Sequence, residues 1–185
     1  MFAEFSNSFA AFTEKLQTLV PYDSCTVTLA AHGDEDNAVI HARGQHADLL
    51  KDRKIATGEG VTGWVLANRQ PFCNTDPKLD LPPHLAERFA DYRTLAVFPL
   101  IRETLMHGAL TLYSSALTEY NADHRRLLEE SAKLLAASLS TIASAAPPQS
   151  STQSITAPQS SPSAPIFGNS PLTPTNAILE SDLAH

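Results

Sequence analysis

The chain has 185 residues, of which 43% are hydrophobic and 18% are charged, a composition that suits one soluble globular domain with accessory segments. Its formal net charge of -7 and the lack of a Lys/Arg cluster exclude the phosphate-neutralising surface of a nucleic-acid-binding protein. No apolar run approaches the roughly 20 residues that cross a bilayer, and the N-terminus lacks the basic region of a signal peptide, so we expect a cytoplasmic protein without a membrane segment.

The first predicted element is an amphipathic helix that ends before Pro21. Its apolar residues recur at alternating spacings of three and four, and they are Phe2, Phe5, Phe9, Phe12, Leu16 and Leu19. The β-branched segments 24–31 and 38–44 flank a turn-rich connection, and this pattern predicts a β-hairpin. Short helices are expected over 46–53 and 63–69.

The middle of the chain predicts a loop and then two strands. Residues 73–83 contain three prolines and show no periodicity, whereas 83–92 predict one or two helical turns. Apolar strands are expected over 93–101 and 107–115. Together with the first helix and the hairpin, this order of elements predicts an α+β fold with an antiparallel sheet between helical layers.

A long helix is predicted over 121–144, with Asn121 as its N-cap. Its apolar stripe consists of Leu128, Ala132, Leu135, Leu139 and Ile142. The first and the last helix either pack on the sheet of their own subunit or pair with their copies in a second subunit. Beyond them, the Pro/Ser/Gln/Thr-rich residues 146–175 predict a disordered linker, and 176–185 predict a short helical remnant.

Residues 58–63, GEGVTG, match the G-x-G-x-x-G pattern of nucleotide-binding loops. The dinucleotide interpretation requires a strand directly before the motif, but the preceding residues KDRKIAT are polar, and no kinase motif or Gly-Lys-Ser/Thr is present. We therefore interpret the first two glycines as a tight turn. Gly63 is interpreted as a close-packing step that lets the next helix approach a sheet, with Trp64 and Val65 as its packing face.

The string IATGEGVTGWVLANRQPFCNTDP, followed by YRTLAVFPLI, HGALTLYSS and a terminal amphipathic helix, resembles a GAF domain over residues 2–144. GAF domains are small-molecule-sensing modules of signalling proteins. The resemblance implies a GAF/PAS-like fold, a central six-stranded antiparallel sheet flanked by helices, and we assign the domain to residues 1–145. It also implies a ligand pocket between one sheet face and residues 70–92, and terminal helices that dimerise and carry the signal.

By position in this fold, the resemblance implies ligand contact by Cys73, Asn74, Asp76, Arg88, Tyr92 and Arg93. The residue types allow other roles. Asn74 and Asp76 also suit Asx turns, Arg88 suits a solvated helix surface, and Tyr92 suits the core. Four polar strand residues either face the pocket or form the solvent side of the alternation, and they are Thr26, Thr28, Thr111 and Tyr113.

The motifs of the chemically defined GAF subfamilies are absent from the sequence. The N-K-x-F-D-E motif of cyclic-nucleotide binders has no match, and Cys73 lacks the neighbouring His of bilin-attaching domains. The two scattered cysteines, Cys25 and Cys73, match the pocket of free methionine sulfoxide reductases poorly, and His84 is expected at the surface rather than as a haem ligand. The histidines show no metal-binding spacing. The ligand and any cofactor therefore stay unknown, and neither a metal site nor a catalytic residue is expected.

Residues 170–185 resemble, with a gap, the start of a GGDEF diguanylate cyclase domain through Pro171, Leu172, Thr173 and Asn176, although no GGDEF motif follows. We therefore expect a non-enzymatic GAF sensor or regulatory module that binds an unidentified small molecule. It is expected to form a homodimer and to relay its signal to a fused or separate output domain of the c-di-GMP type. The alternatives are a GAF-scaffold enzyme, such as a free methionine sulfoxide reductase, and a ligand-free dimerisation module.

Overall fold

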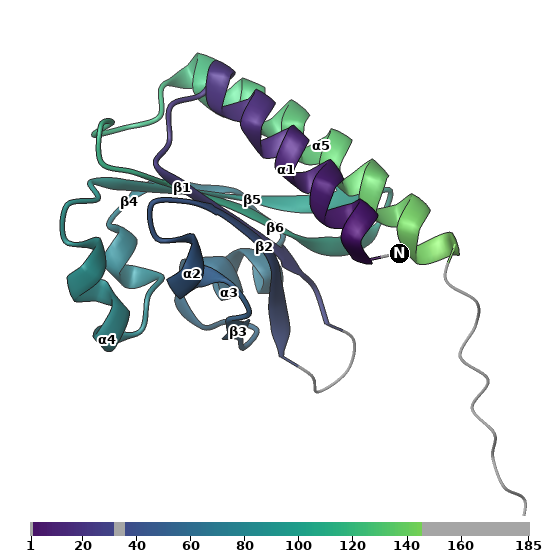
Figure 1. Cartoon of the computed structure of the whole chain (residues 1–185), viewed down its shortest axis with the longest axis horizontal. Helices are drawn as coiled ribbons and strands as arrows, with labels where there is room; N and C mark the ends of the chain where they lie inside the picture. The colour runs from purple at the N-terminus through teal and green to yellow at the C-terminus, as the bar shows by residue number, and fades with distance from the viewer. Residues whose placement is uncertain (1, 32–35, 146–185) are drawn as a thin grey trace, which may run out of the picture. The chain divides into compact units, whose positions relative to one another are not determined.

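Six segments of the chain pair into one antiparallel sheet (Figure 1). The computed structural model describes residues 2–31 and 36–145, with side chains over 8–31 and 36–140. The strands are β1 (Ser24–Leu29), β2 (Asn37–Gly44), β3 (Lys54–Ile55), β4 (Phe72–Thr75), β5 (Thr94–Arg102) and β6 (Leu105–Ser114). Their order is β3-β2-β1-β6-β5-β4, and each neighbouring pair is antiparallel. The linker and the helical remnant expected over 146–185 lie outside the described residues and stay predictions.

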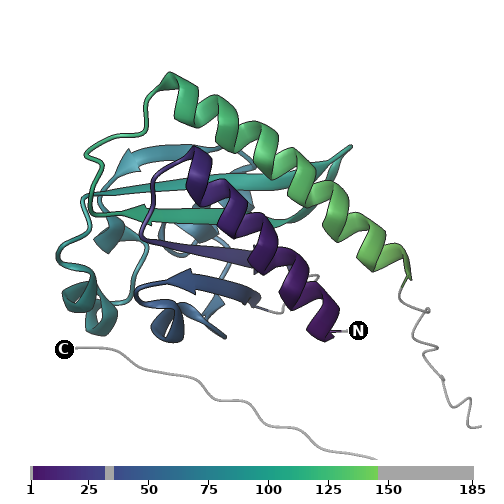
Figure 2. The same cartoon turned by 45° about the horizontal axis from the view of Figure 1, so that its top comes forward.

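Helices cover both faces of this sheet. They are α1 (Phe2–Leu19), α2 (Ala47–Leu50), α3 (Gly60–Asn68), α4 (Pro83–Ala86) and α5 (Ala122–Ala145), with the 3-10 turns η1 (Pro77–Leu79) and η2 (Glu87–Phe89). Helices α1 and α5 lie side by side and antiparallel on one face, here named the α5 face (Figures 1 and 2). Helices α2, α3 and α4 lie on the opposite face, the α3 face (Figure 1). This layering confirms the α+β fold that the resemblance implied.

Each face carries its own hydrophobic core, because successive strand side chains point to opposite faces. On β1, Cys25 and Val27 join the α5-face core, so Thr26 and Thr28 lie on the α3 face. The described part of the α5 stripe is buried in the α5-face core, and it consists of Leu128, Ala132, Leu135 and Leu139. Phe9 and Leu16 of α1 join the same core, with Phe12 half-buried against it. The described parts of both stripes, apart from Leu19, therefore pack on the sheet of their own chain.

The end of α1 departs from its predicted stripe. Leu19 is 50% exposed, because Val20, directly after the helix, is fully buried in the core. The side chains of Phe2, Phe5 and Ile142, which complete the two predicted stripes, lie outside the described side chains.

The glycine-rich segment forms its turn and helix in a different register from the one expected. Helix α3 begins at Gly60 rather than at Gly63. Positive φ angles of 90° at Gly58 and 60° at Gly60 confirm the tight turn. Gly63 is close-packed, but against backbone rather than the sheet, since a Cβ there would lie 2.4 Å from the carbonyl oxygen of Ala56.

The packing face of α3 was predicted only in part. Val65 is fully buried, whereas Trp64 is 39% exposed. Successive residues of a helix point about 100° apart, and in α3 the neighbours that share the core on the α3 face are Val65 and Leu66, whereas Trp64 lies on the outer side of that pair.

Two strands were missed by the sequence analysis, and both lie at the sheet edges. β3 is only two residues long, and β4 lies in the segment predicted to be loop. An edge strand pairs on one side only, so a short segment without strong alternation suffices. The predicted hairpin and strands are confirmed, and Asn121 caps α5 through its Oδ1, which accepts the amide of His124 at 2.8 Å. None of the helices within the described residues has the length and hydrophobicity that crossing a membrane requires.

Candidate functional site

Residues 76–92 cross the α3 face of the sheet, and we name them the lid segment. The segment contains η1, α4 and η2, three elements of at most four residues each. Pro77 and Pro83 stand at the first positions of two of these elements, where a missing amide hydrogen costs nothing. The segment therefore consists of single helical turns held mainly by their contacts with the rest of the domain.

Aromatic side chains fill the space between the lid segment and the sheet. Phe89 and Tyr92 of the lid segment and Tyr113 of β6 are all buried, and the ring of Phe89 lies 5.0 Å from that of Tyr92 and 5.6 Å from that of Tyr113. The ring of His46, directly before α2, lies 4.8 Å from Phe89. The α3-face core is completed by Leu50, Val61, Val65, Leu66, Leu81, Leu95, Val97 and Ala109. The region implied to be a ligand pocket is a packed core in this structure.

A buried carboxyl group lies within this core. Asp80 is 5% exposed, and its Oδ2 accepts a hydrogen bond from the hydroxyl of Tyr113 at 2.6 Å. Its Oδ1 accepts the amide of Thr62, in the first turn of α3, at 2.5 Å. The guanidinium of Arg53 donates to the backbone carbonyl of Asp80 at 3.1 Å. These three contacts attach the middle of the lid segment to β6, α3 and the loop before β3.

Burial raises the pKa of the Asp80 carboxyl above its ordinary value, while the hydrogen bonds from Tyr113 and Thr62 and the charge of Arg53 lower it in part. Burial also raises the pKa of Tyr113, and the nearby charge of Asp80 acts in the same direction. The pair is therefore held with the phenol as the donor and the carboxyl oxygen as the acceptor.

Threonine hydroxyls continue this polar cluster along the α3 face. The hydroxyl oxygens of Thr62 and Thr111 lie 3.0 Å apart and are hydrogen-bonded. Thr26 pairs directly with Thr111 in the sheet register, so both side chains lie on the same face. The hydroxyl of Thr28 is buried and lacks a hydrogen-bond partner among the described residues. All four threonines are buried, which corrects the alternative that the strand threonines face solvent.

Two of the predicted ligand residues have clear structural roles. Asp76 is exposed, and its Oδ1 accepts the amide of Lys78 at 2.9 Å, which confirms the Asx-type turn. Asn74 has a φ angle of +62° and lies at a register shift between β4 and β5. Its side-chain amide donates to the carbonyl of Tyr120 at 3.1 Å, and its Oδ1 accepts the amide of Tyr120 at 2.6 Å. Asn74 thus binds the loop before α5.

The other four predicted ligand residues are spread over both faces. Tyr92 lies in the α3-face core, and its hydroxyl lies 2.7 Å from that of Ser24. Arg88 and Arg93 are exposed. Cys73 is half-buried against the α5-face core, on the opposite side of the sheet from the Asp80 cluster. The structure therefore does not bring the six residues together in one cluster, and their contact with a ligand stays a prediction.

Sequence reasoning did not single out the Asp80 cluster as a site. Asp80 was one of several acidic residues in a proline-rich segment, and Arg53 lies in a segment without a functional motif. Thr62 lies in GEGVTG, which was interpreted as a turn and a close-packing step rather than as a site. The partners Thr62 and Tyr113 lie 18 and 33 residues from Asp80 in sequence. The only local signal is an aspartate between two leucines, Leu79 and Leu81, and it does not identify a buried carboxyl group.

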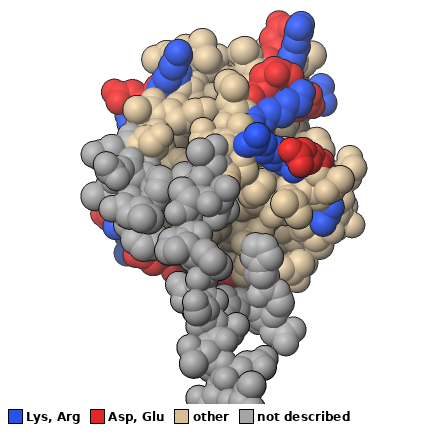
Figure 3. Space-filling view, turned by 90° about the vertical axis from the view of Figure 1, so that its right-hand side faces the viewer, with Lys and Arg blue, Asp and Glu red and all other residues tan. Residues whose placement is uncertain are grey.

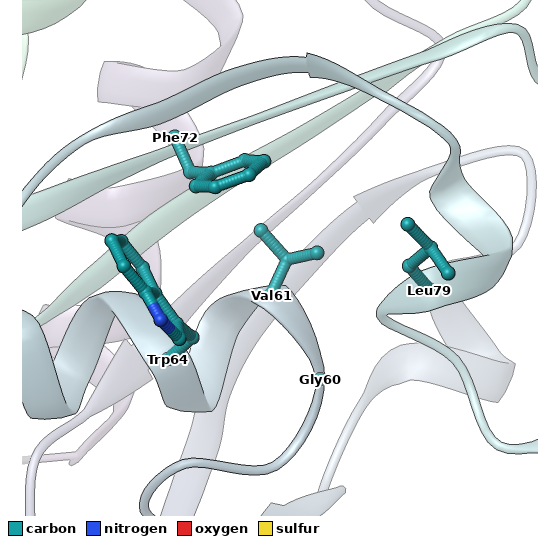
Figure 4. A pocket seen from close by; sticks show the side chains of 5 residues that line it. All are labelled: Gly60, Val61, Trp64, Phe72 and Leu79. Carbon is teal, nitrogen blue, oxygen red and sulfur yellow. The ribbon is translucent and has the colours of Figure 1, made fainter.

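A separate apolar groove lies on the surface between α3, β4 and η1 (Figure 4). It encloses about 360 Å³ and is lined by Gly60, Val61, Trp64, Phe72 and Leu79. Phe72 extends toward Trp64 and Val61, and the rings of Trp64 and Phe72 meet edge to face at 5.3 Å (Figure 4). No group of three His, Cys, Asp or Glu side chains suited to a metal ion occurs among the described residues.

The family model of the GAF domain matches residues 10–140 of the chain. Comparison with curated protein sequences gave no match. Among solved structures, the GAF domain/HD domain protein from Geobacter sulfurreducens is similar at 15% identity and a TM-score of 0.64, over 77% of this chain and 95% of that one. The GAF domain of a two-component sensor histidine kinase from Bacillus halodurans is similar at 20% identity and a TM-score of 0.60, over 73% and 92% of the two chains.

A third similar structure is an enzyme. It is the type II free methionine-R-sulfoxide reductase from Thermoplasma acidophilum, with 18% identity and a TM-score of 0.62 over 76% of this chain and 96% of that one. At such identities the structural matches establish a shared fold and leave the ligand and the chemistry open.

Proposed function

The chain belongs to the GAF domain family, and we propose that it is a sensor module that binds an unidentified small molecule on the α3 face, beneath the lid segment. GAF domains of this fold occur in a sensor histidine kinase, which supports a role in signal transduction. The observation that carries the proposal is the buried polar cluster of Asp80, Tyr113, Thr62, Thr111 and Thr28. Burying polar groups is unfavourable in a core that serves stability alone, so their presence suits a binding surface.

Binding at this place requires displacement of the lid segment, because Phe89 and Tyr92 fill the space above the sheet. Among the six residues with implied ligand contact, Tyr92 is in this space. Arg88 and Arg93 lie on and directly after the lid segment, and Cys73, Asn74 and Asp76 lie before and at its start. An outward movement of the segment would change the surroundings of all six.

Native mass spectrometry of protein purified from its own host tests the proposal, because it reports a retained ligand and the number of subunits together. A thermal-shift screen of small metabolites tests it independently, since a ligand that binds only the folded state raises the melting temperature. Neither a retained mass nor a stabilising compound would be expected if the domain is a ligand-free dimerisation module.

Two matched threonine variants locate the site. Thr28 on the α3 face and Thr94, which alternates with Ala96 onto the α5 face, both bury a hydroxyl without a partner among the described residues. Replacing either by Val removes that unsatisfied group at nearly constant volume and is expected to leave stability unchanged or raise it. Only Thr28→Val is expected to weaken binding of the ligand found above. Equal losses in both variants would place the ligand elsewhere.

Dimerisation is proposed through leucines of α1 and α5 that the sheet does not cover. Leu127 and Leu134 of α5 are 39% and 66% exposed, and Leu19 of α1 is also exposed. Leu127 and Leu134 are seven residues apart and therefore lie on the same side of α5, where they can form an apolar surface on the helical layer. Sedimentation of the wild type and of Leu134→Glu at micromolar concentration tests this: a dimer that becomes a monomer supports the proposal, and a monomeric wild type overturns it.

The surface charges do not favour nucleic acid as a partner. On the face shown in Figure 3, Lys and Arg side chains lie next to Asp and Glu side chains rather than in a separate basic patch. Among the described residues as a whole, Arg43 pairs with Glu14 at 3.7 Å and Lys133 with Glu130 at 2.8 Å. A mixed surface of this kind provides no track for a nucleic-acid backbone.

The second candidate function is a GAF-scaffold enzyme of the methionine sulfoxide reductase type, favoured by the similar structure from Thermoplasma acidophilum. The cysteines argue against it. Cys25 is buried and Cys73 half-buried, both join the α5-face core, and burial raises the pKa of each thiol to about 11. Thiols in this state are poor nucleophiles at neutral pH. An assay of free methionine sulfoxide reduction tests this candidate. If the wild type reduces the substrate and the Cys25→Ser, Cys73→Ser double variant does not, the chain is an enzyme of this type.

The output of the module is proposed to be c-di-GMP signalling in the cytoplasm, on the resemblance of Pro171, Leu172, Thr173 and Asn176 to the start of a GGDEF domain. These residues lie outside the described ones. Deletion of the gene in its host followed by measurement of c-di-GMP tests this part: an altered level is expected, and an unchanged level under all growth conditions would contradict it.

A further inference from the structure

One residue just before the lid segment and one at its end are hydrogen-bonded to the segments that join the two long helices to the sheet. We name residues 20–24, which leave α1, the α1 root, and residues 115–121, which lead into α5, the α5 root. Asn74, two residues before the lid segment, pairs with the backbone of Tyr120 in the α5 root. Tyr92, its last residue, is hydrogen-bonded to Ser24 in the α1 root.

The contact at the α5 root joins the side chain of Asn74 to the backbone of a single residue, Tyr120. Asn74 forms two hydrogen bonds with one backbone unit, the amide and the carbonyl of Tyr120, as a paired strand would. Its positive φ angle is tolerated by asparagine better than by most residues. The ring of Tyr120 is buried in the α5-face core beside α5 residues such as Leu128. A shift of Asn74 therefore displaces a residue that is anchored under α5.

The contact at the α1 root continues into α1 in the same way. The hydroxyls of Tyr92 and Ser24 are hydrogen-bonded in the buried interior. Two residues earlier, the hydroxyl of Tyr22 donates to the backbone carbonyl of Thr13, within α1. The two roots are also joined to each other, because Oδ2 of Asp23 accepts the amide of Ser115 at 2.6 Å and its hydroxyl at 2.9 Å.

Between these two ends, Asp80 holds the lid segment down through Tyr113 and Thr62. We propose that the lid segment is a mechanical coupler: release of Asp80 displaces it, and the Asn74–Tyr120 and Tyr92–Ser24 contacts transmit the displacement to the roots of α5 and α1. This inference rests on the proposed function for its purpose and names the residues that carry the signal. Packed elements with alternative arrangements convert a local displacement into a change at a distance.

The coupling can be tested without a ligand, by hydrogen exchange of the full chain. Tyr113→Phe removes one hydrogen bond to Asp80 without a cavity, and Asp80→Ala removes both side-chain contacts. Each is expected to raise amide exchange in the two roots by about 3-fold or more, and to leave the β5–β6 turn at 102–105 unchanged. If the substitutions change amide exchange in this distant turn as much as in the two roots, the proposal is overturned. If Asp80→Ala does not fold, Tyr113→Phe alone decides.

A double-mutant cycle tests the contacts themselves. Asn74→Gly removes the side chain but still permits the positive φ angle, and Asn68→Gly removes an exposed amide on α3 as its matched control. In the Asn74→Gly background, Tyr113→Phe is expected to change exchange in the α5 root by less than about 1.5-fold, while the Asn68→Gly background keeps the full response. Tyr92→Phe is expected to reduce the response of the α1 root.

Full responses in both the Asn74→Gly and the Tyr92→Phe backgrounds would overturn the role of these contacts. The result is independent of the ligand search. A chain that binds no small molecule would overturn the proposed function and leave the coupling measurable, whereas unresponsive roots would overturn the coupling and leave ligand binding intact.

Discussion

The hydroxyl of Tyr113, on the central strand β6, donates a 2.6 Å hydrogen bond to Oδ2 of Asp80 in the middle of the lid segment. This contact joins a buried residue of the central strand to the segment whose displacement the proposed ligand binding requires. Because the carboxyl group of Asp80 holds the lid segment against the sheet, the position of the segment depends on the protonation state of this one residue.

The pH dependence of stability is expected to change in Asp80→Asn. The folded state raises the pKa of Asp80, so between the ordinary value of 3.8 and the raised value the folded chain binds more protons than the unfolded chain. The Asp80 carboxyl therefore raises the free energy of unfolding as pH falls from the raised pKa towards 3.8. Above the raised pKa the carboxyl is ionised in the folded chain, and the cost of burying its charge lowers stability. Asn cannot ionise, so the free energy of unfolding of Asp80→Asn relative to wild type is expected to be higher at about pH 7.5 than at about pH 4.5.

Urea denaturation at several pH values measures this difference, and subtracting the two proteins cancels the other titrating groups. Parallel stability curves for the two proteins would show that the Asp80 carboxyl has the same pKa in the folded and the unfolded chain.

His41 is expected to act in the opposite direction. It lies on β2 under α1, with its Nε2 3.3 Å from the hydroxyl of Thr13, and burial together with the charge of Arg43 lowers its pKa below 6.5. As pH falls, the unfolded chain therefore binds the His41 proton before the folded chain does. The contribution of His41 to the free energy of unfolding begins to be lost below about pH 6.5, and it is fully lost only below the folded-state pKa. Arg43 is itself paired with Glu14 of α1 at 3.7 Å, so protonation adds a second positive charge beside this ion pair.

The variant His41→Gln is expected to lose less stability than wild type between about pH 7 and pH 5. His84→Gln, in the exposed helix α4, serves as the matched control and is expected to keep the wild-type loss. Equal losses in all three proteins would rule out His41 as the source.

Adjacent leucines of α5 are expected to differ sharply. Leu135 is 2% exposed in the α5-face core, whereas Leu134 is 66% exposed. Leu135→Ala leaves a cavity and is expected to lower the free energy of unfolding by about 2–5 kcal/mol. Leu134→Ala is expected to change it by less than about 0.5 kcal/mol in the monomer. Denaturant titration of dilute protein measures both, and similar costs would contradict the packing of α5 on its own sheet.

The glycines of GEGVTG are expected to tolerate substitution unequally. A Cβ at Gly63 would lie 2.4 Å from the carbonyl oxygen of Ala56, and backbone cannot easily move away. Gly63→Ala is therefore expected to cost about 2–3 kcal/mol. At Gly58 nothing lies within 4 Å of a Cβ, so only the φ angle of +90° opposes Gly58→Ala. That conformational cost is about 1 kcal/mol. Thermal and urea unfolding of both variants measure the difference, and the reverse order would contradict the close approach at Gly63.

Much of the secondary structure follows from local patterns. The period of the apolar residues predicted α1 and α5, and the β-branched runs predicted the hairpin and the strands β5 and β6. Helix α3 began three residues early, because a glycine at positive φ and the carboxylate of Asp80 provide its first turn, and neither is visible in a hydrophobic pattern. The edge strands were missed because β3 and β4 are short and pair on one side only.

The sequence by itself determined the two long helices, the hairpin, the strands β5 and β6 and the family, because helical and strand periodicity and the string from Ile55 to Pro77 are properties of neighbouring residues. The tertiary structure decided the rest. It buried Asp80 beneath residues 18 and 33 positions away, paired Asn74 with Tyr120, and placed Cys73 on the face opposite the Asp80 cluster. Such relationships depend on which segments the sheet brings together and on how completely they exclude water, and a one-dimensional pattern contains neither quantity.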